Sequence, residues 1–344
     1  MDISLNTLAP ETCHDLLLNT LVPILGYSSH QDFATWRESV RARLRELVGP
    51  EPAVVPLNVK REYDIVRDGF REIRFQFTSE TGADVPCHLL VPAQVTAPCP
   101  VVICLQGHTT GMHISLARPK SAADERMVAD GDRDFALQAV REGYAALVME
   151  QRCFGERSDR RNAEARHYSN GCQHASMVSL LLGRTMIGER VWDVSRAIDA
   201  LAEFPEVDLA RIGCMGNSGG GTITYFAACL EPRISIAMPS CYVCSLRHSI
   251  ARIDHCADNY VPGFLRWFEL ADVSCLIAPR PLVVVAGETD SIFPIAGVHE
   301  ANAQIREIYR ASGAPNRCRL IVGNGGHRFY AAQSWPVFRE LSGW

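Results

Sequence analysis

The sequence predicts an α/β protein in which helices cover both faces of a mainly parallel central sheet. Short, continuous apolar runs recur along the chain, and such runs are typical of strands that are buried on both faces. Segments with an apolar residue every three or four positions lie between these runs and indicate helices. Strands that alternate with helices form βαβ units, and these units build a parallel sheet between two helical layers.

Residues 1–52 are predicted to form a helical extension in front of a larger domain at 53–344. One face of a helix in this extension carries the apolar stripe Phe33, Trp36, Val40, Leu44 and Leu47. Ser29, with Asp32 three residues later, predicts the start of this helix, and Gly49-Pro50 predicts its end. An exposed stripe of this size is unfavourable. We therefore expect it to pack on the larger domain or between copies of the chain in a homo-oligomer.

The larger domain begins with residues whose apolar period is two. Val59–Val66 and Ile73–Phe77 flank the turn signal Asp68-Gly69 and predict an antiparallel hairpin, and Cys87–Val91 predicts a third strand. Buried strands are expected at Val101–Leu105, Ala145–Met149, Ile212–Met215, Ile234–Met238, Leu282–Ala286 and Arg319–Val322. Helices are expected at Phe135–Glu142, Glu189–Phe204, Gly220–Leu230 and Ala296–Ala311.

Three connections are too long to be simple crossovers: residues 109–134, 151–188 and 240–281. Each leaves the carboxyl end of a predicted strand, which is the edge where an open α/β sheet binds its ligand. We expect these segments to act as lids over a site.

Composition excludes several classes of function. The chain has 344 residues, of which 47% are hydrophobic and 21% are charged, with a formal net charge of −5. Binding to nucleic acid or to an anionic membrane calls for basic patches, so neither partner is expected. No apolar run reaches the length of about 20 residues that a membrane helix needs, and residues 1–14 do not resemble a secretory signal. The 13 cysteines are an odd number scattered through predicted strands and helices. They predict reduced thiols in a cytoplasmic protein.

Gly216-Asn217-Ser218-Gly219-Gly220 fits the G-x-S-x-G pattern of a nucleophile elbow. The turn from strand to helix is sharp, so the serine takes a strained backbone and its neighbours must lack side-chain bulk. The pattern alone also fits a tightly packed glycine-rich turn. Two further residues decide in favour of chemistry, because Asp290 and His327 follow the next-to-last and last predicted strands.

Ser218, Asp290 and His327 stand in the order of nucleophile, acid and base that α/β-hydrolases use. His327 would take the Ser218 proton, and Asp290 would orient the imidazole. Glu288 is the rival acid. The oxyanion hole is predicted to combine the backbone N–H groups of Gly219 and His108. A base role for the His108 side chain is the weaker interpretation.

Neither a metal nor an organic cofactor is expected, because a serine triad makes its nucleophile by proton transfer. The Cys241–Cys244 pair is interpreted as structural, since no second pair at zinc spacing accompanies it. A metal site at His248, Asp254 and His255 is the weaker alternative.

Further motifs resemble the acetyl xylan esterase-like branch of the dienelactone hydrolase and esterase families. They are Tyr260-Val-Pro-Gly263, Ala278-Pro-Arg-Pro-Leu282, Gly287-Glu-Thr-Asp290-Ser-Ile-Phe-Pro294 and Gln151-Arg-Cys-Phe-Gly-Glu156. The resemblance spans about residues 55–344 and implies an α/β-hydrolase fold and hydrolysis of small acyl esters, often on carbohydrates, without a cofactor. Gln106 departs from the family, because many relatives have a histidine there. Ser218 replaces the cysteine nucleophile of dienelactone hydrolases and favours ordinary esters.

The predicted function is therefore a serine hydrolase that cleaves small acyl esters, with acetyl as the expected acyl group. A peptidase or lactonase on the same scaffold is the alternative, because a triad fixes acyl transfer and leaves the leaving group open. A non-catalytic binding protein is disfavoured by the complete triad. Trp267 and Phe268 in the segment 240–281 are expected to close a small acyl pocket, and Tyr242 and Phe293 are candidates for an aromatic wall.

Overall fold

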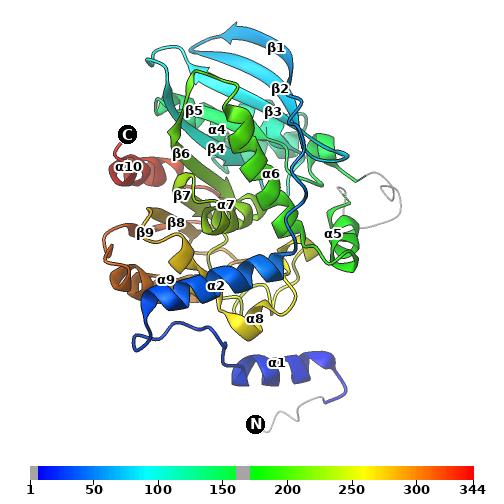
Figure 1. The fold of residues 1–344 in the computed structure, drawn as a ribbon, viewed down its shortest axis with the longest axis vertical. Helices are drawn as coiled ribbons and strands as arrows, with labels where there is room; N and C mark the ends of the chain where they lie inside the picture. The colour runs from blue at the N-terminus through cyan, green and yellow to red at the C-terminus, as the bar shows by residue number, and fades with distance from the viewer. Residues whose placement is uncertain (1–6, 160–170) are drawn as a thin grey trace.

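The computed structural model describes residues 7–159 and 171–344. Its centre is a nine-stranded sheet in the order β1-β2-β3-β5-β4-β6-β7-β8-β9 (Figure 1). The strands are β1 Lys60–Arg67, β2 Phe70–Glu80, β3 Ala83–Pro92, β4 Cys99–Leu105, β5 Ala145–Met149, β6 Val207–Asn217, β7 Ile234–Ser240, β8 Leu282–Gly287 and β9 Cys318–Gly323. Each of them contains or overlaps a run that the sequence predicts as a strand.

Strand direction divides the sheet into two parts. The pairs β1–β2, β2–β3 and β3–β5 are antiparallel, and every pair from β5–β4 to β8–β9 is parallel. The predicted hairpin around Gly69 is confirmed, with Arg67 opposite Phe70. The prediction of a mainly parallel sheet between helices is also confirmed.

Two helical layers bury the two faces of the sheet. The helices are α1 Pro10–Thr20, α2 Phe33–Val48, α3 Ala122–Ala129, α4 Phe135–Arg141, α5 Cys172–Leu181, α6 Met186–Leu201, α7 Gly219–Leu230, α8 Phe264–Trp267, α9 Ile295–Ala311 and α10 Ala331–Ser342. Short 3₁₀ helices are η1 Met112–Leu116, η2 Gly155–Arg157, η3 Ala257–Asn259 and η4 Leu270–Leu276. Helices α6, α7 and α9 contribute to one apolar core, and α4 and α10 contribute to the other.

The pleat of β4 shows how the sheet serves both cores. Val101 and Ile103 belong to the core under α6 and α7, whereas Val102 and Cys104 belong to the core under α4 and α10. Successive side chains of a strand point to opposite faces, so a strand between two helical layers must be apolar throughout. This requirement explains the continuous apolar run from which β4 was predicted.

Helix α2 packs its apolar stripe within the chain. Of the predicted stripe, Trp36, Val40 and Leu44 are buried and the other two members are partly buried, and the helix contacts η4. The predicted start needs a correction, because Asp32, not Ser29, caps the helix by accepting a hydrogen bond from Thr35 N. The end at Gly49 is as predicted, with a φ of 98°.

Helix α1 lies at the end of the molecule near the N-terminus (Figure 1). It contains no buried residue, and Leu16 and Leu17 are exposed. Association of copies through the N-terminal helices therefore stays a prediction. Within the described ranges, no helix combines the length and the apolar character that crossing a membrane would require.

The three long connections carry the short helices. Segment 109–134 contains η1 and α3, segment 151–188 contains η2 and α5, and segment 240–281 contains η3, α8 and η4. Residues 160–170 of the second predicted lid lie outside the described residues. All 13 cysteines lie in the described ranges, and no disulfide joins any two of them, in agreement with the predicted reduced thiols.

Candidate active site

Ser218 stands at the turn where β6 ends and α7 begins. Its backbone has φ 59° and ψ −126°, a conformation that costs about 1–3 kcal/mol for a residue with a side chain. The flanking glycines make the turn sterically feasible. A Cβ at Gly220 would lie within 2.0 Å of Leu105 O, and one at Gly216 would lie 2.6 Å from the Gly220 carbonyl carbon. The predicted elbow geometry is present.

Contacts with β7 hold the elbow in this conformation. Ser218 N donates to Ser240 O at 2.9 Å, and the Asn217 amide and the Ser240 hydroxyl are 2.7 Å apart. Both residues beside the bend are therefore fixed to the neighbouring strand, which offsets the strain of the turn.

Asp290 and His327 meet at the carboxyl edge of the sheet. Asp290 follows β8, His327 follows β9, and Asp290 Oδ2 lies 2.8 Å from His327 Nδ1. The other carboxylate oxygen accepts from Ile292 N at 2.8 Å and from Phe293 N at 3.2 Å. Burial works to raise the pKa of Asp290, but these hydrogen bonds outweigh it, so the pKa is lowered and the carboxylate stays ionised. The rival acid, Glu288, is exposed.

The imidazole of His327 is also held from other sides. The Phe293 ring stacks on the imidazole with centroids 5.8 Å apart, and the Arg133 guanidinium donates to the backbone carbonyl of His327 at 3.3 Å. Across the described ranges, no hydrogen bond joins Ser218 Oγ to His327. Such contacts often tighten only when substrate is bound.

The turn after β4 lies directly against the elbow. A Cβ at Gly107 would lie 2.8 Å from Ser218 Cβ, and one at Gly219 would lie 3.1 Å from His108 Nδ1. The structure thus brings together Gly219 and His108, the two residues predicted to supply the oxyanion hole. Their backbone N–H groups are candidates to bind a developing negative charge beside Ser218.

Gln106 fixes this turn, and the sequence does not reveal that role. Its side-chain amide nitrogen donates to Ser115 Oγ at 2.7 Å and to Arg133 O at 2.8 Å, and its backbone carbonyl accepts from the Gln151 side chain. Because Gln106 is buried, these hydrogen bonds satisfy polar groups that have little access to water.

With the geometry in place, comparison with known proteins identifies the family. A model of the Abhydrolase family matches residues 13–322. The chain belongs to this family. This assignment confirms the predicted α/β-hydrolase fold and supports the prediction of a hydrolytic enzyme.

Relatives of this Abhydrolase chain include YtaP of Bacillus subtilis (strain 168), whose name describes it as a hydrolase. It is 26% identical over 319 residues, which cover 90% of this chain and 99% of YtaP. A protein of Bacteroides fragilis NCTC 9343, named as an acetyl xylan esterase, matches with a TM-score of 0.78 and 17% identity, covering 97% and 89% of the two chains. A glucuronoyl esterase from Solibacter usitatus matches with a TM-score of 0.70 and 16% identity, covering 94% and 97%.

The expected aromatic closure of the acyl pocket is wrong for two residues of this Abhydrolase chain. Phe268 is fully buried and packs on Phe264 with centroids 5.3 Å apart. Trp267 lies under the guanidinium of Arg43 from α2, 3.8 Å from the ring centroid. Trp267 therefore contacts helix α2, and Phe268 packs within segment 240–281. The sequence pattern could not reveal this, because the partners are far away in the chain.

A small cavity lies beside α7. It has a volume of about 210 Å³ and is lined mostly by apolar residues of α7 and segment 240–281, including Phe226, Tyr242 and Ile250. Asn259 in its wall accepts a hydrogen bond from Thr222 Oγ1 at 2.9 Å, one turn after Ser218. The lining contains no member of the candidate triad.

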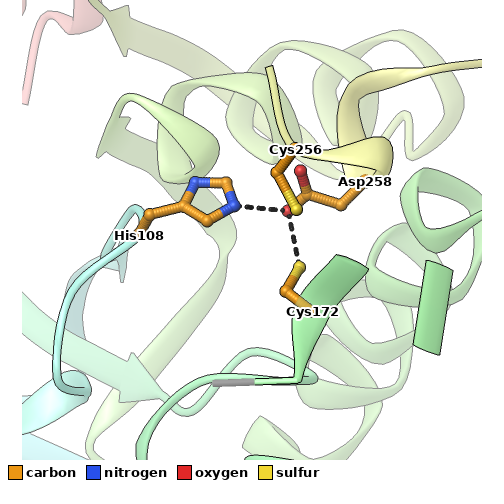
Figure 2. Close-up of side chains that lie close together, drawn as sticks. All are labelled: His108, Cys172, Cys256 and Asp258. Carbon is orange, nitrogen blue, oxygen red and sulfur yellow. Dashed lines mark hydrogen bonds and ion pairs between the residues drawn. The ribbon is translucent and has the colours of Figure 1, made fainter. Parts of the chain in front are cut away.

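Two groups of side chains in the described ranges have metal-ligand spacing. One consists of Cys241, Asp290 and His327 and therefore overlaps the candidate triad. The other consists of His108, Cys172, Cys256 and Asp258 (Figure 2). Sequence reasoning missed this second group, because its members come from three segments and form no local motif.

The cysteines and histidines that the sequence offered as metal ligands have other surroundings in the structure. Cys241 and Cys244 are buried, and burial raises the pKa of each thiol to about 12. They remain neutral and structural, as interpreted. His248 lies 3.4 Å from Glu300, whereas His255 lies 3.1 Å from Ser249 Oγ, so the two imidazoles have separate partners.

His108 is poorly suited to act as a base. Burial works to lower the pKa of its imidazole, but the Asp258 carboxylate beside Nε2, at 3.0 Å, raises it to about 9. An imidazole that already holds its proton at neutral pH cannot accept another. This favours the predicted role for the backbone of His108.

Proposed function

We propose that this protein is a serine esterase that hydrolyses small acyl esters, with acetyl as the preferred acyl group. The observation that carries the proposal is the strained Ser218 elbow, which lies against the Gly107-His108 turn at the same edge of the sheet as the Asp290–His327 pair. A glycine-rich turn that served only for tight packing would need neither an ionised acid–imidazole pair nor backbone N–H donors near it.

The reaction proceeds in two halves. His327 Nε2 takes the proton of Ser218 while Ser218 Oγ attacks the acyl carbon, and the carbonyl oxygen becomes an oxyanion held by Gly219 N–H and His108 N–H. Collapse of this intermediate expels the alcohol, which takes the proton from His327. Water then repeats the sequence on the acyl-enzyme and releases the acid and free Ser218. Asp290 holds Nδ1 of His327 throughout and stabilises the imidazolium.

Carbohydrate esters are the proposed substrate class. Proteins with the same fold are named as acetyl xylan or glucuronoyl esterases, and the sequence motifs resemble the acetyl esterase branch. Segments 109–134, 151–188 and 240–281 are proposed to cover the site and to restrict the acyl group. Cysteines that form no disulfide fit a reducing compartment, so we propose that the enzyme is cytoplasmic.

A Ser218→Ala variant tests the nucleophile. Triad knockouts typically lower turnover by about six orders of magnitude, and the removal of one hydroxyl from Ser218 should leave the melting temperature nearly unchanged or higher, because alanine does not increase the strain. A serine-reactive phosphonate should label Ser218 in the wild type and leave the cysteines unmodified. Wild-type-like turnover in Ser218→Ala would refute the assignment.

A panel of p-nitrophenyl esters, acetylated sugars and a peptide amide tests the substrate class. We expect kcat/KM to be highest for acetyl and to fall by butyryl, because a tight pocket gains little from added methylenes and loses by overpacking. A steady rise from acetyl to octanoyl would indicate an open lipase-like groove. Preferential cleavage of the amide would favour the peptidase alternative.

A further inference from the structure

Four side chains converge in a small space beside the candidate oxyanion turn. His108 follows β4, Cys172 begins α5, Cys256 precedes η3 and Asp258 lies within η3. Figure 2 shows the four pointing toward one another from these separate segments. Their ligand atoms, namely His108 Nε2, the two thiol sulfurs and an Asp258 oxygen, all lie within 4.8 Å of one another.

The distances within this cluster are close to those of a tetrahedral zinc site. Zinc binds sulfur at about 2.3 Å and nitrogen or oxygen at about 2.0–2.2 Å, so its ligand atoms are about 3.3–3.8 Å apart. Asp258 Oδ2 lies 3.0 Å from His108 Nε2 and 3.2 Å from Cys172 Sγ. These two pairs would need to move apart by only a few tenths of an ångström to accommodate an ion, and the other ligand atoms lie within 4.8 Å of one another.

His108 Nε2 is buried and lacks an acceptor in hydrogen-bond geometry among the residues that the structure describes. Its 3.0 Å contact with Asp258 Oδ2 is an ion pair that does not meet the geometry of a hydrogen bond. Buried polar atoms are rarely left in this condition. A metal ion between Nε2, the carboxylate and the thiols would satisfy the nitrogen.

Arg190 supplies the outer support that metal ligands usually have. Its guanidinium is almost fully buried and donates to Asp258 Oδ2 at 2.6 Å, and it lies 3.4 Å from Cys172 Sγ. The ring of Phe154 packs under it at 4.4 Å. Hydrogen bonds of this kind orient ligating groups. The charges also balance once His108 Nε2 releases its proton to solvent on binding zinc, because Zn²⁺ and Arg190 then offset two thiolates and one carboxylate.

We propose that His108, Cys172, Cys256 and Asp258 form a structural zinc site. Two thiolates and an imidazole favour zinc over calcium or magnesium, which prefer oxygen ligands. Four protein ligands leave no open coordination position, so the ion would have no contact with substrate. It would tie segments 151–188 and 240–281 to the turn that carries His108. This inference revises the expectation that the chain carries no metal, and it is independent of the proposed esterase activity.

Metal content of the full-length protein is the first test. We expect about one zinc ion per chain by elemental analysis after purification under reducing conditions, and tight rebinding of Zn²⁺ after removal with a chelator. Co²⁺ in the emptied site should give the visible bands of tetrahedral coordination and a thiolate-to-cobalt charge-transfer band. Zinc-free protein that neither rebinds Zn²⁺ nor develops these bands would refute the site.

Cys256→Ser is the informative variant, because Cys256 is only partly buried and its replacement should be tolerated. It should lower zinc affinity by at least about tenfold and weaken the charge-transfer band. Cys275→Ala, a buried thiol of η4 outside the cluster, is the matched control and should keep the full zinc content. Equal zinc loss in both variants, or a Cys172–Cys256 disulfide in the freshly purified protein, would overturn the proposal. Ester hydrolysis is not the readout, so a failed zinc site and a failed esterase assignment can be told apart.

Discussion

A methyl group at Gly107 should separate the oxyanion turn from the nucleophile. In Gly107→Ala the new carbon would lie 2.5 Å from Asn217 O and 2.8 Å from Ser218 Cβ. Unstrained carbon contacts are about 3.5 Å or longer, so the turn or the elbow must retreat by about 1 Å. A displacement of this size in an active site can cost about 10²-fold in rate. We therefore expect kcat for an acetyl ester to fall about 10²-fold while KM changes little.

The assay is steady-state hydrolysis of p-nitrophenyl acetate, with the circular dichroism spectrum as a check that the fold is retained. Gly26→Ala is the matched control, because its new carbon would meet Pro23 O at an ordinary 3.4 Å. The control should keep wild-type activity. A folded Gly107→Ala protein with wild-type kcat would show that this turn does not contribute to catalysis and would refute the proposed oxyanion hole.

Three further predictions concern the acid, a buried carboxyl group and the N-terminal helices. Asp290→Asn should lower kcat about 10⁴-fold, because His327 loses the partner that fixes its tautomer; an unchanged kcat would disprove that pairing. Burial raises the pKa of Glu150 from 4.5 to about 7, so the folded state binds this proton more tightly than the unfolded state. Stability should then be fully present below about pH 4.5 and fall by up to about 3 kcal/mol as the pH rises to about 7. Urea unfolding of Glu150→Gln should lack that decline, and a pH profile identical to the wild type would contradict the assignment. Trp36→Ala should destabilise the protein by about 3–5 kcal/mol, because the ring is buried and its N–H donates to Leu25 O at 2.8 Å. The exposed Glu38→Ala is its control, and equal urea midpoints for the two variants would show that α2 contributes nothing to stability.

The sheet was predictable because the apolar period of a strand is a local property of the sequence. Helix α10 was not predicted, and Pro336 inside it explains why. Proline removes a backbone donor and usually breaks a helix, so the segment lacked a helical signature. Here burial of Trp335 and Phe338 outweighs that cost. The start of α2 was misplaced for a similar reason, since Ser29 and Asp32 both fit a cap and only the structure shows which of them accepts the bond.

Within the candidate site, the residues with a local motif could be predicted and those without one could not. Ser218 is marked by the glycines on either side, and Asp290 and His327 follow strand signals. No local sequence motif identifies Gln106 or Asp258. Their roles depend on Arg133 and His108, which come from other segments and meet them only in the folded chain. The packing of Trp267 and Phe268 was misjudged for the same reason, because the size of a residue does not show which way its side chain points.

The strand order has a consequence for how activity appears during folding. His108, Ser218, Asp290 and His327 follow β4, β6, β8 and β9, so the site joins parts of the chain that are far apart in sequence. Parallel pairings between such distant segments form slowly, because each must first close a long loop. No local fragment can hold both the nucleophile and its base. Recovery of ester hydrolysis after dilution from denaturant should therefore lag behind the recovery of helical signal and should report completion of the sheet at β9.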